Sequence, residues 1–178
     1  RLCQRFDTTS LHRAGKKIIL VNCSGSPIAL EPETKNCEAI LQAWYPGQAG
    51  GTAVADVLFG DYNPGGRLPV TFYRNMSQLP DFEDYNMTGR TYRYMTQQPL
   101  FPFGYGLSYT TFEYGNLSLA KEQIKVGEPL KLTVNVTNNG QRDGEEVVQV
   151  YLKKQDDAEG PGKTLRAFKR VRIPAGKS

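Results

Sequence analysis

Hydrophobic and polar positions in the first 72 residues alternate between short apolar runs and helical patterns. Residues 4–13 predict a helix that ends at Gly15, because glycine adopts the left-handed conformation that closes many helices. Residues 18–21 are apolar on both faces, which is typical of a parallel strand covered by helices. Residues 39–45 fit a strand or a helix equally well.

The same alternation continues to residue 72. Residues 52–59 predict a helix, because their apolar positions recur at spacings of three and four. A turn at 63–66 is rich in glycine and proline, and residues 68–72 read as a further strand. Strands alternating with helices indicate an α/β layer.

Residues 74–108 show neither the periodicity of a helix nor that of a strand, and they contain three prolines and three glycines. Stretches this long without regular structure are usually functional or lie between domains. The stretch is also rich in aromatic residues, which could join two domains or could line a sugar-binding cleft by stacking on pyranose rings. We favour the joining role.

From residue 109 onward the pattern is that of β-strands. Residues 130–136 alternate strictly between apolar and polar side chains, and the turn at 138–140 separates them from the next apolar run at 147–152. A further strand is expected at 165–173. Short strands at this spacing predict a sandwich. The fold class expected is therefore a partial α/β layered domain followed by an all-β sandwich that is truncated.

Composition narrows the function classes. The chain has 178 residues and a net charge of +4, and no apolar run is long enough for a transmembrane helix. Residues 150–178 hold eight Lys and Arg against three Asp and Glu, but Phe168 is the only aromatic residue within the basic stretch 163–172, which argues against nucleic-acid binding. Three cysteines without a C-x-x-C spacing and a single histidine, His12, argue against a metal site.

Motifs for catalysis are weak. The glycines of residues 47–51 precede a helix, but they lack the lysine of a phosphate loop, and close packing explains them better. Glycoside hydrolysis needs two carboxylates, yet none of the candidates follows an apolar strand that would hold it rigidly. These candidates are Asp56, Asp61, Asp81, Glu83 and Asp84. From motifs alone no reaction centre is visible.

Longer motifs carry a family resemblance. Residues 17–30 (KIILVNCSGSPIAL), 43–51 (AWYPGQAGG) and 56–72 (DVLFGDYNPGGRLPVTF) resemble the C-terminal α/β domain of glycoside hydrolase family 3. Residues 102–112 (PFGYGLSYTTF) resemble that family's passage into its fibronectin type III-like domain. The resemblance implies three parts: the C-terminal portion of the α/β domain at 1–80, an aromatic-rich interdomain loop at 81–108, and an incomplete fibronectin type III-like domain at 109–178.

The resemblance also implies an activity. It indicates the C-terminal fragment of a retaining, exo-acting β-glycosidase that removes terminal β-linked xylose or glucose from oligosaccharides without a cofactor or metal. The nucleophilic Asp and the acid/base Glu are expected upstream, so this piece alone is expected to be inactive. The oligosaccharide substrate would be bound through a barrel domain, and no nucleic-acid or membrane partner is expected. The resemblance allows a homodimer and implies a periplasmic or secreted location.

The resemblance further suggests which residues could reach the substrate. Residues 89–94 (GRTYRY) are similar to a loop of the family's β-xylosidase members more than to the β-glucosidase form. Arg90, Tyr92 and Arg93 are therefore candidates for the rim of the cleft. The competing interpretation is an interdomain clamp, in which Arg90 or Arg93 pairs with Glu83 or Asp84. A non-catalytic carbohydrate-binding or interaction module is the alternative for the whole chain.

Overall fold

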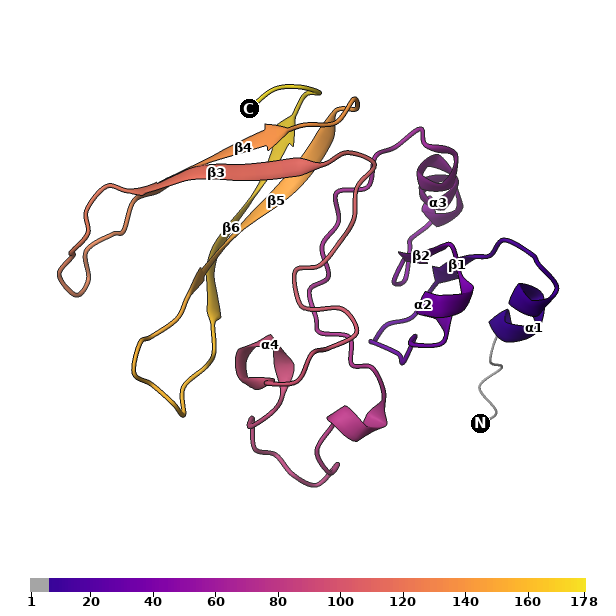
Figure 1. The fold of residues 1–178 in the computed structure, drawn as a ribbon, viewed down its shortest axis with the longest axis horizontal. Coiled ribbons are helices and arrows are strands. Elements are labelled where there is room, and N and C mark those ends of the chain that lie inside the picture. Colours follow the sequence, from indigo (N-terminus) through magenta and orange to yellow (C-terminus); the bar gives the residue numbers. More distant parts are fainter. Residues whose placement is uncertain (1–6) are drawn as a thin grey trace.

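The computed structural model describes residues 7–178. Helices and a small parallel sheet form the N-terminal part, and antiparallel strands form the C-terminal part (Figure 1). Two central segments, residues 66–72 and 100–106, run side by side between them. The expected order, an α/β layer followed by a β-sandwich, is confirmed.

The N-terminal part is built on two parallel strands. Strand β1 (Ile19–Asn22) pairs in parallel with β2 (Ala39–Gln42), which resolves the ambiguous run after residue 38 as a strand. The Asp7 carboxylate caps the first helix, which begins at Thr8, by accepting from the Ser10 N–H at 3.0 Å. Residues 4–6 of the predicted helix lie outside the described residues. The elements are α1 (Thr8–Arg13), β1 (Ile19–Asn22), α2 (Glu33–Asn36), β2 (Ala39–Gln42) and α3 (Gly50–Phe59).

The α3 helix matches its predicted position. It begins at Gly50, where a Cβ atom would lie 2.5 Å from the Pro46 ring, so close packing requires this glycine. It ends at Phe59, and the next residue, Gly60, has a φ of 86° and closes the helix in the left-handed conformation.

The strand predicted at residues 68–72 is wrong. This segment is extended, but it makes only an isolated bridge, between Phe72 and Phe101. Leu68 N–H donates to the Tyr105 carbonyl at 2.8 Å and Phe72 N–H donates to the Phe101 carbonyl at 2.9 Å, but residues 69–70 between them form a bend. The bend therefore reduces the predicted strand to isolated hydrogen bonds.

The segment between residues 74 and 108 is irregular, as predicted, apart from two short helical turns. These are η1 (Met76–Gln78) and α4 (Thr91–Tyr94). Phe72, which precedes the segment, is almost fully buried and meets the rings of Trp44 and Phe101 edge-on at 6.1 and 6.2 Å. This aromatic cluster anchors the segment to the α/β part.

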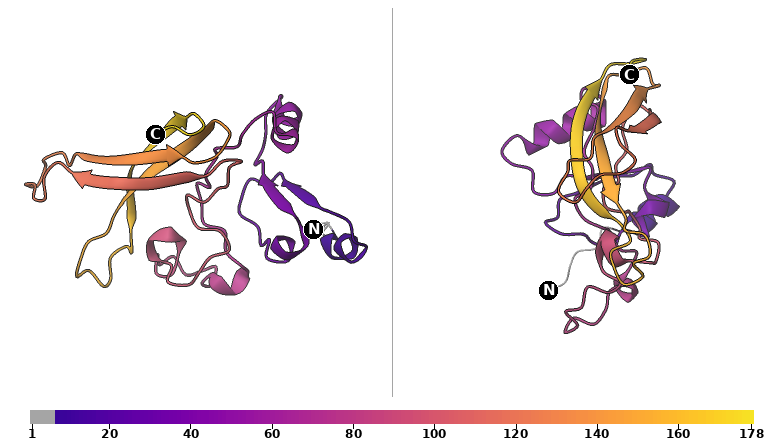
Figure 2. Two further views of the ribbon diagram at one scale, coloured as in Figure 1. Left: turned by 45° about the horizontal axis from the view of Figure 1, so that its top comes forward. Right: turned by 90° about the vertical axis from the view of Figure 1, so that its left-hand side faces the viewer.

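Two pairs of antiparallel strands form the C-terminal part as separate layers (Figure 2). Their members are β3 (Phe112–Leu119) and β4 (Leu132–Asn138) in one layer, and β5 (Gly144–Leu152) and β6 (Thr164–Ile173) in the other. Alternation in β4 is confirmed, since its even-numbered side chains from Leu132 on are the more buried. The β3 strand shows no such alternation in burial, because most of its side chains are exposed.

Asn138 is a buried polar residue that links several segments of the C-terminal part. Its side chain is fully buried and makes four hydrogen bonds. The Asn138 Oδ1 atom accepts from the Thr110 hydroxyl and from the Gly140 N–H. The Asn138 Nδ2 atom donates to the carbonyls of Arg142 at 2.8 Å and Ile173 at 2.9 Å. One amide thus joins the entry to β3, the β4–β5 turn and the end of β6.

Glycine is required where the two central segments approach each other. A Cβ atom at Gly106 would lie 2.2 Å from the Gly66 carbonyl oxygen, so the main chain would have to move. We expect Gly106→Ala to lower the free energy of unfolding by about 2 kcal/mol, measured by urea denaturation. Gly115→Ala is the control, because nothing lies within 4 Å of a Cβ there. Equal effects of the two changes would contradict the packing argument.

Candidate functional site

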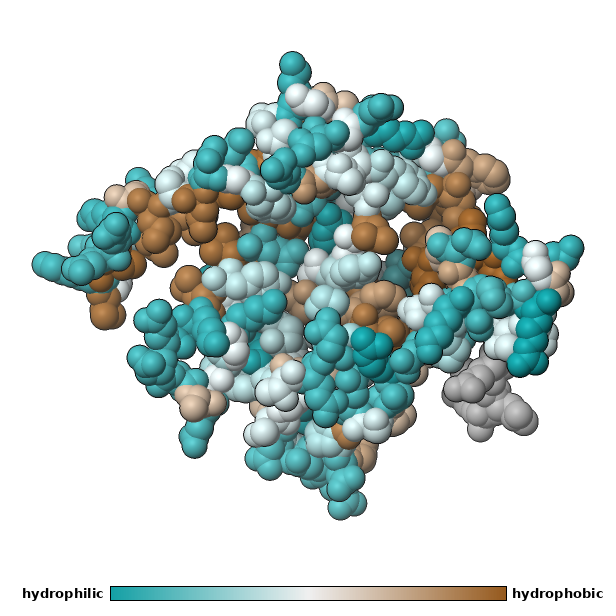
Figure 3. Space-filling model, in the orientation of Figure 1, coloured by the Kyte–Doolittle hydropathy of each residue, from teal (hydrophilic) through white to brown (hydrophobic). Residues whose placement is uncertain are grey.

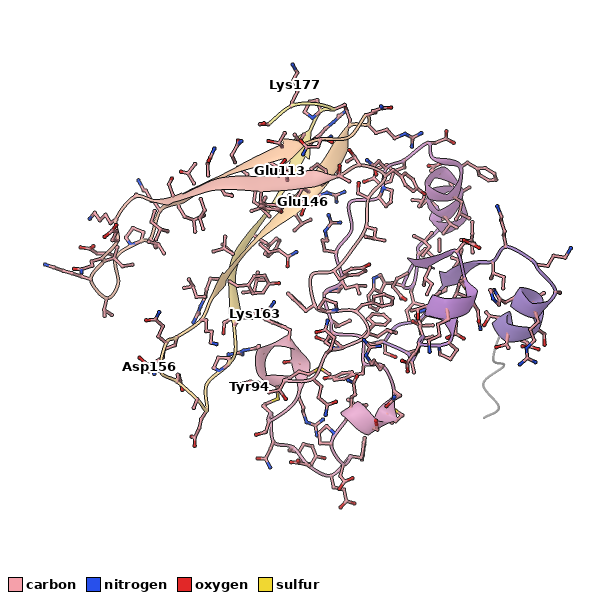
Figure 4. The ribbon with its side chains drawn as sticks, in the orientation of Figure 1. Tyr94, Glu113, Glu146, Asp156, Lys163 and Lys177 are labelled. Carbon is pink, nitrogen blue, oxygen red and sulfur yellow. The ribbon has the colours of Figure 1, made fainter. Side chains whose placement is uncertain are left out.

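A hollow of about 360 Å³ lies between the two parts of the chain, and polar side chains from both parts line it. Arg67 comes from the central segments, and Glu146 and Gln149 come from β5. Figure 4 shows Glu146 on the sandwich side and Lys163 just before β6, in the connection that contacts α4 through the Gly162 N–H and the Arg93 carbonyl. The hollow therefore marks the junction of the two domains.

A buried ion pair closes one wall of this hollow. The Arg67 guanidinium donates to Glu146 Oε2, and both side chains are about one-tenth exposed. The Tyr114 hydroxyl donates to the other oxygen of Glu146 at 2.7 Å. Burial and this carboxylate raise the pKa of Tyr114 above its ordinary value of 10, because both disfavour a tyrosinate. The arrangement holds the domains together and offers no free acid or base.

The Tyr114 pKa predicts a loss of stability in alkali. A raised pKa in the folded state means that its contribution is present below pH 10 and is lost as the pH rises above 10, where unfolded tyrosine ionises. Tyr114→Phe is expected to flatten the fall of the urea midpoint between pH 9 and pH 11. Tyr85→Phe is the control, because Tyr85 is largely exposed. A wild-type pH profile in Tyr114→Phe would refute the assignment.

Arg90, a predicted rim residue, is folded into its own loop. Its Nε atom donates to the Asn86 carbonyl at 2.9 Å, and its Nη2 atom donates to the carbonyls of Asp81 and Asp84. The expected pairing of Arg90 with a carboxylate does not form, because the main-chain carbonyls of the loop turn inward around the guanidinium. Arg90 therefore fixes the shape of residues 81–90.

Tyr92 connects α4 to the sandwich. Its ring stacks on Phe103 at 4.3 Å between centroids and meets Tyr151 edge-on at 5.9 Å. Its hydroxyl accepts from the Leu165 N–H of β6 at 3.2 Å. The Tyr92 side chain thus lies at the domain junction.

Arg93 contacts the sandwich through its main chain, whereas Tyr92 does so through its side chain. Its carbonyl accepts from the Gly162 N–H at 2.6 Å, which adds a second link between α4 and the β5–β6 connection. Its guanidinium lies over the Tyr94 ring at 5.6 Å, and its buried Nε atom has no hydrogen-bond partner within the described residues. The rim role of Arg90, Tyr92 and Arg93 stays a prediction.

Aromatic residues of the 74–108 segment divide into two groups. Tyr92 stacks on Phe103 and meets Tyr151 of the sandwich edge-on, as the joining role requires, whereas Phe101 and Tyr105 stack on each other within the segment. Phe82 and Tyr85 are instead at least 90% exposed. Exposed hydrophobic side chains also gather along the β3–β4 hairpin and over α3 (Figure 3).

Asp84, one of the carboxylates considered for catalysis, lies in a turn and bonds to its near neighbour. Asp84 accepts from the Asn86 N–H at 2.9 Å and from its Nδ2 atom at 2.8 Å, which is a turn-stabilising role. Among residues 7–178, no group of three or more His, Cys, Asp or Glu side chains could hold a metal. No helix in that range is long and apolar enough to cross a membrane.

A polar cluster that motif reasoning missed lies at the carboxyl ends of β1 and β2. The Asn22 Nδ2 atom donates to Gln42 Oε1 and, at 3.0 Å, to the Ser24 hydroxyl. The turn sequence after residue 21 had marked a loop, but pairing with β2 was needed to place Gln42 beside it. Open α/β sheets bind ligands at this edge.

Comparisons with known families agree with both parts of the fold. Residues 7–109 match the model of the glycosyl hydrolase family 3 C-terminal domain, and residues 146–178 match a fibronectin type III-like domain. The chain is 59% identical, over 98% of its length, to a xylan 1,4-beta-xylosidase of Xylanibacter ruminicola. It is 40% identical, over 97% of its length, to a periplasmic beta-glucosidase of Salmonella typhimurium.

Solved structures show the same arrangement. Beta-glucosidase 3B from Thermotoga neapolitana, in complex with glucose, superposes on 96% of this chain with a TM-score of 0.83 and 36% identity. The chain covers 26% of that structure, and 20% and 24% of the two relatives above. It therefore spans about a fifth to a quarter of the length of the proteins it matches.

Proposed function

Because the chain belongs to glycoside hydrolase family 3, we propose that it forms the C-terminal part of a retaining, exo-acting β-glycosidase with a preference for β-xylosides. The observation that carries the preference is the 59% identity to a xylan 1,4-beta-xylosidase, against 40% to a periplasmic beta-glucosidase. The similarity of residues 89–94 to the β-xylosidase form of their loop supports the same choice.

In this proposal the chain does not supply the reacting carboxylates. Double displacement uses one carboxylate as nucleophile and a second group as acid and then base, and both are expected in the preceding part of the polypeptide. This chain instead contributes a rigid surface formed by the 81–90 loop and α4. Arg90 shapes the 81–90 loop, and the links from Tyr92 and Arg93 to the sandwich fix α4.

The proposal extends to substrate and location. The parent enzyme acts on oligosaccharides that end in β-linked xylose, and it works in the periplasm or outside the cell. A relative named as a periplasmic beta-glucosidase supports the location. A homodimer is part of the proposal and is checked by light scattering of the full-length polypeptide.

The test uses the full-length polypeptide that contains this chain. We expect kcat/KM for an aryl β-xyloside to exceed that for the aryl β-glucoside by about tenfold or more, because a pocket fitted to a pentose excludes the extra hydroxymethyl group. An aryl α-arabinoside is the second comparison. A higher kcat/KM for the glucoside would overturn the xylose preference. Absence of hydrolysis on all three substrates would overturn the glycosidase and favour a non-catalytic module.

A further inference from the structure

The backbone is strained where β2 ends. Trp44 has a φ of 55°, a left-handed conformation that is strained for a large side chain and persists only when its surroundings impose it. The surroundings are the Phe72 ring, against which Trp44 packs edge-on, and the Ala43 N–H, which donates to the Asn22 carbonyl at 2.9 Å. Strain of this kind clusters at functional sites.

Tyr45 is seated against the turn that follows β1. A Cβ atom at Gly25 would lie 2.5 Å from Cε2 and 3.0 Å from Cζ of the Tyr45 ring, so the ring rests directly on the Gly25 main chain. The Tyr45 side chain is nevertheless 78% exposed. A strained backbone and an obligatory glycine thus hold an aromatic ring in place while most of its surface stays open to solvent.

The groups beside Tyr45 are uncharged hydrogen-bonding groups. Asn22, Ser24 and Gln42 form the polar cluster at the same edge, with the Gln42 Nε2 atom 3.4 Å from the Ser24 hydroxyl. Amides and hydroxyls match the hydroxyl groups of a neutral sugar, and an open aromatic face stacks on the C–H face of a pyranose. A charged ligand would need a counter-charge that this cluster does not contain.

We propose that Tyr45, with Asn22, Ser24 and Gln42, forms a binding surface for a neutral pyranose unit of an oligosaccharide. The inference rests on the proposed function for the kind of sugar, a β-linked xylose oligomer. Tyr45 supplies the stacking face, Gly25 and Trp44 position it, and the amide cluster supplies hydrogen bonds at the carboxyl edge of the sheet.

The fluorescence of Trp44 can report binding, because Trp44 is the single tryptophan of the chain and precedes Tyr45. We expect xylotetraose to cause a saturable change in Trp44 emission. In Tyr45→Ala the dissociation constant should rise about tenfold or more, whereas Tyr45→Phe, which keeps the ring, should stay within about twofold of wild type. Gly25→Val should weaken binding like Tyr45→Ala, because its side chain displaces the ring.

Phe59→Ala is the matched control, since Phe59 is an aromatic residue of α3 that is 83% exposed. Circular dichroism checks that each variant is folded. No saturable change in the wild type, or equal binding by Tyr45→Ala, would overturn the inference. The readout needs no hydrolysis, so a failed activity assay on the full-length polypeptide and a failed binding assay are separate outcomes.

Discussion

Asn138→Ala is expected to lower the free energy of unfolding by about 4 kcal/mol. The change leaves the Thr110 hydroxyl, the Gly140 N–H and the carbonyls of Arg142 and Ile173 without the partner that the buried amide supplies. Each buried polar group left unpaired costs about 1–3 kcal/mol, and partial relaxation reduces the sum. Urea denaturation followed by circular dichroism measures the effect.

The neighbouring residue provides the control. Asn139 is exposed, and its amide donates to the Glu113 carboxylate at 2.7 Å. Asn139→Ala should cost less than about 1 kcal/mol, because water replaces an exposed hydrogen bond. Asn138→Asp is a second test, since it keeps the shape but removes both donated bonds. If Asn138→Ala and Asn139→Ala were equally mild, the central role of Asn138 would be wrong.

Glu146→Ala is expected to cost about 3–5 kcal/mol. Removing one member of a buried ion pair leaves the Arg67 guanidinium desolvated and without its carboxylate. The Tyr114 hydroxyl loses its acceptor at the same time. Because this cluster joins the two domains, the loss should also make the central segments around Arg67 more susceptible to limited proteolysis.

Glu145→Ala is the matched control for this prediction. Glu145 pairs with Arg170, but the two side chains are one-third and one-half exposed, and surface pairs contribute about 0–1 kcal/mol. The double change Arg67→Met with Glu146→Leu should recover much of the lost stability, since no charge is then buried alone. A loss as large in the double variant as in Glu146→Ala would mean that the ion pair itself, rather than the unpaired charge, is responsible.

Local patterns predicted several regular elements well, β4 and α3 among them. Alternation in β4 and the helical stripe of α3 are properties of neighbouring residues, so they are visible without a partner. The segment at 68–72 failed because an apolar run does not show whether a facing segment can accept its hydrogen bonds. A bend at residues 69–70 interrupts the pairing with the facing segment.

The candidate site was less accessible to sequence reasoning. The resemblance of residues 89–94 directed attention to Arg90, Tyr92 and Arg93, but their present partners are main-chain groups and rings up to 73 residues away in the chain. The strained Trp44 and the seat of Tyr45 on Gly25 have no sequence signature beyond a glycine-containing turn.

By itself, the sequence determined the family, the order of an α/β part and a β part, and most strand and helix positions. Those properties follow from local periodicity and from long motifs in a fixed order. The tertiary structure alone decided that Asn138 and Glu146 are buried and satisfied, and that Tyr45 is held open beside an amide cluster. Burial and hydrogen-bond satisfaction depend on which distant segments meet, and that information is not carried by any single stretch of residues.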